Sequence, residues 1–146
     1  MRGGGGKHLH LLFFNKQEDK TMKQYKIFDK DFYFDYNVYA QKEIAKLCPS
    51  GTLNNLGRLI DSKQGEGIIY ENLTQILLIL NKAASLTRRF FEGKDDSAEL
   101  TEDMIYCLRD SDFSDLTTLA FACISEGNET EVETKSTSKK EESNHK

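Results

Sequence analysis

The sequence predicts an α+β fold that is predominantly α-helical: a short N-terminal β-hairpin followed by a compact bundle of about five helices, with disordered tails. Residues 24–36 alternate apolar and polar side chains, as strands do, whereas apolar residues further along recur every three or four positions, as in helices. The chain has 146 residues, of which 38% are hydrophobic and 30% charged. This is enough for one domain with a modest core.

The hairpin is expected in "QYKIFDKDFYFDY" (24–36). Its alternating apolar positions are Tyr25, Ile27, Phe32, Phe34 and Tyr36. The polar "DKD" (29–31) separates the two alternating runs. Such alternation on both sides of a polar turn is typical of two paired strands.

Two short helices are expected next. Asp35 or Asn37 can cap the first helix, and Pro49 with Gly51 stops it. The face that this helix turns to the core comprises Tyr36, Ala40, Ile44, Leu47 and Cys48. The apolar positions of the second helix are Leu53, Leu56 and Ile60. The composition of "DSKQGEG" (61–67) then predicts a loop.

The most regular apolar stretch is "QILLILNKAASLTRRFFEG" (75–93). It belongs to a helix expected from about Glu71 to Glu92, with Gly93 as its C-terminal cap. The apolar positions that recur every three or four residues should face inward: Leu73, Ile76, Leu77, Leu80, Ala83, Ala84, Thr87 and Phe91. Ile79 and Leu86 widen this surface, so we expect the helix to form the centre of the core.

Two more helices are expected before the C-terminal tail. Thr101 can cap the first, which carries Glu102 and Asp103 in its first turn and Ile105 and Leu108 on its apolar face. The last helix should begin within 111–115 and end at Gly127. Its expected apolar face comprises Phe113, Leu116, Ala120, Cys123 and Ile124.

The predicted domain therefore spans residues 22–127, with a tail on each side. Residues 1–21 are expected to be a disordered leader. "KQEDKTM" can be back-translated to contain AGGAGG about eight bases before an ATG, so translation that starts at Met22 would omit this leader. Residues 128–146 are polar and carry charges of both signs, which predicts a disordered charged tail.

We expect no catalytic, cofactor-binding or metal site, and therefore no enzyme. The three histidines (His8, His10 and His145) all lie in the tails, where nothing could hold a catalytic geometry. "DSDFSD" (110–115) starts like a calcium loop, but Asp115 occupies the glycine position of that loop. The segment is better explained as a helix N-terminus.

The net charge and the cysteines indicate which partners and which cellular compartment to expect. The net charge of −4 makes nucleic acid an unlikely partner, and no apolar run approaches the length of a membrane span. A helix-turn-helix at 100–124 would place acidic residues at the start of its recognition helix. Three cysteines without metal-ligand spacing (Cys48, Cys107 and Cys123) are expected to be core residues in a reducing cytoplasm.

From about Met22 onward, the layout resembles the tail assembly chaperones of long-tailed (siphovirus-type) bacteriophages and prophages. The resemblance rests on the hairpin and first helix in "IFDKDFYFDYNVYAQKEIAKL", the long apolar helix, "LTEDMIYCL", a last helix ending in "CISEG", and the charged tail. It implies that the protein binds the tape-measure protein, keeps its apolar helices soluble and recruits tail-tube subunits. Ser138–Lys140 can also be encoded with the slippery heptamer A AAA AAG, as frameshifting in such families would require.

The candidate partner-contact residues are Arg88, Arg89, Phe90 and Phe91. If Arg88, Arg89 and Phe90 lie outside the core face, they form an exposed aromatic group with flanking cations, as at interface anchors. Alternatively, both phenylalanines are core residues and the arginines complement the helix dipole. Replacing both arginines with Glu should then change stability only slightly.

Three classes of function are compatible with the sequence. The first is the chaperone, for which self-association is a further option. The second is a small helical regulator or adaptor, including a DNA-associated one, and the third is a subunit of an enzyme. Affinity for a long apolar helix, salt-dependent DNA retention and a bound cofactor would distinguish them.

Overall fold

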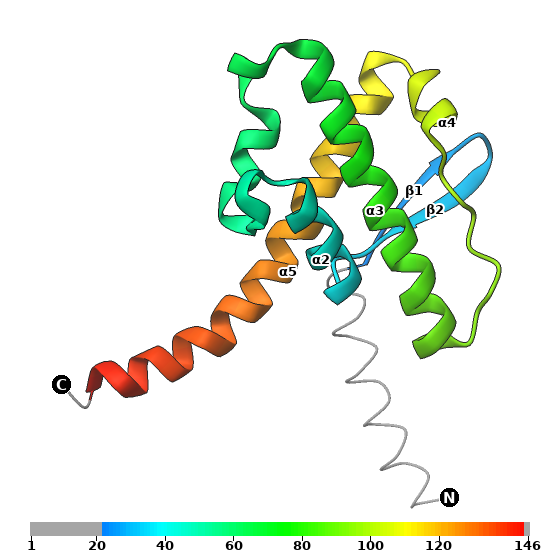
Figure 1. Ribbon diagram of the computed structural model, residues 1–146. Coiled ribbons are helices and arrows are strands. Elements are labelled where there is room, and N and C mark those ends of the chain that lie inside the picture. The colour runs from blue at the N-terminus through cyan, green and yellow to red at the C-terminus, as the bar shows by residue number, and fades with distance from the viewer. Residues whose placement is uncertain (1–21, 145–146) are drawn as a thin grey trace, which may run out of the picture.

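The computed structural model describes residues 22–144, with side chains described as far as Asn128. It confirms the predicted class: a two-stranded hairpin followed by about five helices, most of the chain being helical (Figure 1). The predicted leader (1–21) lies outside the described residues, as do all three histidines. The domain boundaries stay a prediction.

The hairpin pairs β1 (Lys23–Ile27) with β2 (Lys30–Phe34) in antiparallel register. The turn was predicted at 29–31, which is wrong, because Lys30 and Asp31 already belong to β2. The turn is Phe28–Asp29, where φ is +55° and +61°. A two-residue turn with positive φ at both positions matches the twist of the flanking strands, and this sets the register. The buried side chains of the hairpin are Ile27, Phe32 and Phe34.

Helix α2 (Val38–Leu47) is capped by Asn37, whose side chain accepts a hydrogen bond from the Ala40 N–H at 3.1 Å. This confirms one of the two predicted caps. The inward face is as predicted, with Tyr36, Ala40, Ile44 and Cys48 buried. Leu47, the fifth residue predicted for this face, is half-buried.

Three 3₁₀ helices follow: η1 (Pro49–Gly51), η2 (Leu53–Ile60) and η3 (Ser62–Gln64). Of the apolar positions expected in the second helix, Ile60 is 39% exposed, and Leu59, which was not named, is buried instead. A 3₁₀ helix repeats every three residues, so Leu59 continues the row that Leu53 and Leu56 begin.

Helix α3 (Glu66–Glu92) begins at Glu66 rather than at Glu71 and ends at Gly93, which adopts the predicted left-handed cap (φ 67°). Its buried residues are Thr74, Ile76, Leu77, Leu80, Asn81, Ala83, Ala84, Thr87 and Arg88. Two predicted inward residues differ: Leu73 is half-buried, and Phe91 is 59% exposed. The last turn of α3 lies at the edge of the molecule, where little else covers it (Figure 1).

Helix α4 (Glu102–Tyr106) has the predicted cap, since the Thr101 hydroxyl accepts a hydrogen bond from the Met104 N–H at 3.3 Å. The predicted apolar residue Ile105 is buried. Helix α5 (Asp110–Asn144) begins close to the predicted start and supplies the buried residues Leu116, Ala120, Cys123 and Ile124.

The predicted end of the last helix at Gly127 is wrong, because α5 continues through this glycine. Gly127 is buried against Tyr36, and a Cβ atom there would lie 2.5 Å from the Tyr36 Cδ2 atom. The glycine therefore permits a close contact rather than ending a helix. The backbone of residues 128–144 is helical where we expected a disordered tail.

The cysteines follow the core prediction only in part. Cys48 and Cys123 are buried, but Cys107, just after α4, is exposed, so its predicted core position is wrong. Burial in the apolar core, with the charge of Asp35 as a smaller cause, raises the pKa of Cys123 to about 12. Its thiol therefore stays protonated and unreactive at neutral pH.

Candidate functional site

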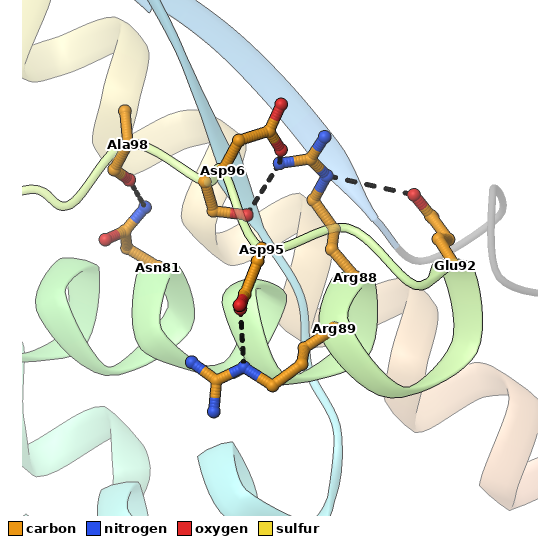
Figure 2. Close-up of polar contacts among 8 residues, drawn as sticks. Asn81, Arg88, Arg89, Glu92, Asp95, Asp96 and Ala98 are labelled. Carbon is orange, nitrogen blue, oxygen red and sulfur yellow. Dashed lines mark hydrogen bonds and ion pairs between the residues drawn. The ribbon is translucent and has the colours of Figure 1, made fainter.

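The four candidate residues lie at the C-terminal end of α3, where the chain reverses at Gly93. We call residues 94–100 the strap, because they run back along α3 without regular structure (Figure 2). The Lys94 N–H donates to the Arg88 carbonyl at 3.0 Å, which closes the helix end. Further along, the Leu100 N–H donates to the Asn81 side chain at 2.9 Å, and Asn81 donates to the Ala98 carbonyl at 3.4 Å. Asn81 thus fixes the far end of the strap.

Arg88 holds the middle of the strap and is only 7% exposed. Its guanidinium donates to the Ser97 hydroxyl at 2.6 Å and forms ion pairs with Asp96 at 3.2 Å and Glu92 at 3.8 Å (Figure 2). The guanidinium carbon also lies 4.2 Å from the centroid of the Tyr33 ring, a cation–π geometry. Arg88 does not lie outside the core face, as the partner-contact interpretation supposed, because its side chain joins the hairpin, the helix and the strap.

Arg89 points to solvent, as the partner-contact interpretation expected. Its side chain is 53% exposed, and its Nε–H donates to Asp95 at 3.1 Å. Asp95 is itself 82% exposed, so the ion pair is screened by water and contributes little to stability. The earlier expectation of a slight effect on replacement by Glu therefore applies to Arg89 alone.

Phe90 and Phe91 are 76% and 59% exposed. The alternative that both are core residues is wrong, although the arginines do lie near the helix C-terminus as that alternative supposed. A phenylalanine can bury 150–250 Å² or so, which makes two adjacent exposed rings a costly surface to leave in water. We call Phe90 and Phe91 the aromatic end of α3.

A second side of the same helix end is also fixed. The Thr87 hydroxyl donates to the buried Asp35 carboxylate at 2.6 Å. It accepts a hydrogen bond from the Asn37 side chain at 3.0 Å, and Asn37 also donates to the Ala83 carbonyl at 2.9 Å. The aromatic end is therefore presented by a helix held on two sides, and binding through it would cost little ordering of the backbone.

Sequence reasoning missed Asn81 and did not recognise that Arg88 holds the strap against this helix. A signal was present, because Asn81 lies between Leu80 and Ala84 on the apolar face and Arg88 follows seven residues later. A polar residue inside such a stripe needs a partner once it is buried. The strap carboxylates, which follow the arginine pair a few residues later in "RRFFEGKDD", were available partners.

The part of the chain that the structure describes gives little support for a metal site or a membrane-spanning helix. Within residues 22–128, whose side chains the structure describes, no group of three or more His, Cys, Asp or Glu side chains could hold a metal ion. None of the described helices is long and apolar enough to cross a membrane. Comparison with known proteins found no matching family model, no similar curated protein and no similar solved structure.

Proposed function

We propose that this protein is a non-enzymatic tail assembly chaperone of the long-tailed phage type, which binds the tape-measure protein and recruits tail-tube subunits in the cytoplasm of a bacterial host. One observation carries the binding function: the exposed aromatic end, Phe90 and Phe91, lies on a helix that a buried polar network holds in place. The choice of chaperone among binding proteins rests on the resemblance in layout.

The chemistry of the aromatic end suits an apolar helix as its partner. Each phenylalanine that becomes buried contributes about 2 kcal/mol by area. Arg89 lies beside the rings, its guanidinium carbon 6.0 Å from the Phe90 centroid, and can pair with an acidic residue at the edge of the contact. A long partner with repeated apolar faces could bind several copies of the chain and stay soluble.

The other two classes find less support. A DNA-associated regulator would need cations where α5 begins, but that turn carries Asp110 and Asp112. An enzyme subunit would need a cluster of reactive groups, and the strongest polar cluster, around Arg88, consists of satisfied structural contacts. Partner binding is therefore the function that we propose.

The test is to sequence the gene with its downstream region and to co-express the chain with the long helical product encoded there. The proposal expects an overlapping frame near Ser138, then a very long helical reading frame whose product is soluble only when this chain is present. A downstream product that is equally soluble alone would contradict it.

A further inference from the structure

A second surface lies at the other end of α3, where its first turns meet the start of α5. On α3 it is lined by Glu66, Ile69, Tyr70 and Leu73, which recur every three or four residues. Such residues form one stripe along a helix about 10 Å long. Tyr70 is 50% exposed, and the neighbouring Ile68 is 44% exposed.

A matching stripe on α5 forms the other wall. Asp110, Phe113, Ser114 and Thr117 have the same spacing as the α3 residues. The rings of Tyr70 and Phe113 lie 5.3 Å apart and join the two walls. The result is an open groove of about 440 Å³ between two helix stripes. Two neighbouring helix stripes with apolar side chains between them can accept a third helix, as ridges enter grooves in helix packing.

The charges at this groove are all of one sign. Glu66 and Asp110 line it, and neither forms an ion pair with any residue that the structure describes. Each lies in the first turn of its helix, where the helix dipole tolerates a carboxylate. A partner that brings cations to both carboxylates would add electrostatic complementarity to the apolar contact.

We propose that this groove, defined by Glu66, Tyr70, Asp110 and Phe113, binds a cationic amphipathic helix of a partner protein through its apolar face. Leucine-like side chains of the partner contact Tyr70 and Phe113, and flanking Lys or Arg residues pair with Glu66 and Asp110. This site is separate from the aromatic end and does not depend on the proposed chaperone function.

The test uses two designed helical peptides of 14 residues or so, one built from Leu and Lys and the other from Leu and Glu, each with a single Trp. Because the chain contains no Trp, the fluorescence of the peptide reports binding without background from the protein. The proposal expects the Leu/Lys peptide to bind the full chain at least about ten-fold more tightly than the Leu/Glu peptide.

Variants distinguish binding at this groove from general attraction of the peptide to the negative charge of the protein. Glu66→Lys with Asp110→Lys should weaken binding of the Leu/Lys peptide about ten-fold. The control, Glu99→Lys with Asp103→Lys, makes the same change in net charge and should bind like the wild type. Tyr70→Ser should also weaken binding about ten-fold, and circular dichroism verifies that each variant is folded.

Three results would overturn the proposal. These are equal affinity or no affinity for both peptides, unchanged affinity in the Glu66/Asp110 variant, and equal losses in that variant and its control. A fourth such result would come from sedimentation of the protein without peptide. If the wild type is a dimer that Tyr70→Ser dissociates, a second copy of the chain occupies the groove instead.

Discussion

The two ends of α3 differ in how their polar groups are satisfied. In the C-terminal half, Asn81, Thr87 and Arg88 are buried and each has hydrogen-bond partners in the strap or beside the hairpin. In the N-terminal half, the hydroxyl of the buried Thr74 has no hydrogen-bond partner among the residues that the structure describes, and the wall beyond it opens into the groove at Tyr70. The C-terminal half is held by a buried polar network. The N-terminal half is held by apolar packing and by two separate hydrogen bonds, from the Asn72 side chain to the Leu59 carbonyl at 2.8 Å and from the Gln75 side chain to Glu102 at 2.9 Å.

The two ends of α3 therefore expose apolar surface in two different ways. The aromatic end presents Phe90 and Phe91 from a fixed backbone, which favours a defined contact with little loss of entropy on binding. The groove at the other end exposes Tyr70 between two helices, whose side chains can adjust to a partner. Variants at each end should therefore affect stability and binding in different proportions.

The largest loss of stability is expected for Asn81→Leu. It removes the acceptor of the buried Leu100 N–H and the donor to the Tyr33 and Ala98 carbonyls. We expect the free energy of unfolding to fall by about 3 kcal/mol, measured by urea denaturation. Ser85→Ala, one turn further along the same helix, should stay within about 0.5 kcal/mol of the wild type. Equal effects would mean that the strap does not stabilise this end.

The arginine pair gives the next largest effect. Arg88→Met should lower the free energy of unfolding by about 2 kcal/mol, because a buried guanidinium with three polar partners is lost. Arg89→Met should change it by less than about 0.5 kcal/mol, since its ion pair is exposed. Thermal unfolding of the two variants side by side tests this. Equal losses would contradict the structural role of Arg88.

The two buried threonines of α3 should respond with opposite signs. Thr74→Val removes a hydroxyl that has no partner in the described part of the chain and should raise the free energy of unfolding by about 1 kcal/mol. Thr87→Val breaks the hydrogen bond to Asp35 and should lower it by a similar amount or more. Denaturant midpoints with unchanged slopes would establish both values. A loss of stability in Thr74→Val would show that this hydroxyl is satisfied.

The smallest effect concerns the contact of the hairpin with the start of α5. The Tyr25 hydroxyl donates to Asp112 at 3.2 Å. Burial, with the hydrogen bond and charge of Asp112 as further causes, raises the pKa of Tyr25 from 10.0 to about 12. A raised pKa means that the neutral phenol stabilises the fold below pH 10 and that this contribution is lost as the pH approaches 12.

The wild type should therefore exceed Tyr25→Phe in stability by about 0.5 kcal/mol at pH 8, and the difference should shrink above pH 10. Cys123 titrates in an overlapping range, but it is common to both proteins and cancels in the comparison. The measurement is urea unfolding of both proteins from pH 8 to 11.5. A difference that grows with pH would contradict the assignment.

Local signals in the sequence predicted much of the fold. The Asn37 and Thr101 caps and the Gly93 helix end depend on a few neighbouring residues, and all three are confirmed. The errors arose where tertiary contacts decide the outcome. Gly127 carries a strong helix-ending signal, but its contact with Tyr36, distant in sequence, determines its role.

The candidate site was predicted only in part, for a similar reason. Helical spacing places Phe91 on the core face, yet nothing in the sequence says where the body of the molecule ends beneath that face. The partner-contact interpretation placed Arg88 outside the core face, but Tyr33 and the strap enclose it. Exposure at a helix end depends on which segments return to cover it.

The central claim is that the aromatic end binds an apolar helical partner. The most direct measurement is the affinity of the full chain for the long helical partner that the proposed function expects, with Phe90→Ser/Phe91→Ser compared with Phe28→Ser. Phe28 is 48% exposed at the hairpin turn, away from α3, and is the matched control. The account predicts that the double variant unfolds like the wild type but loses at least about ten-fold in affinity, whereas Phe28→Ser keeps it. Equal affinity of all three proteins would contradict it.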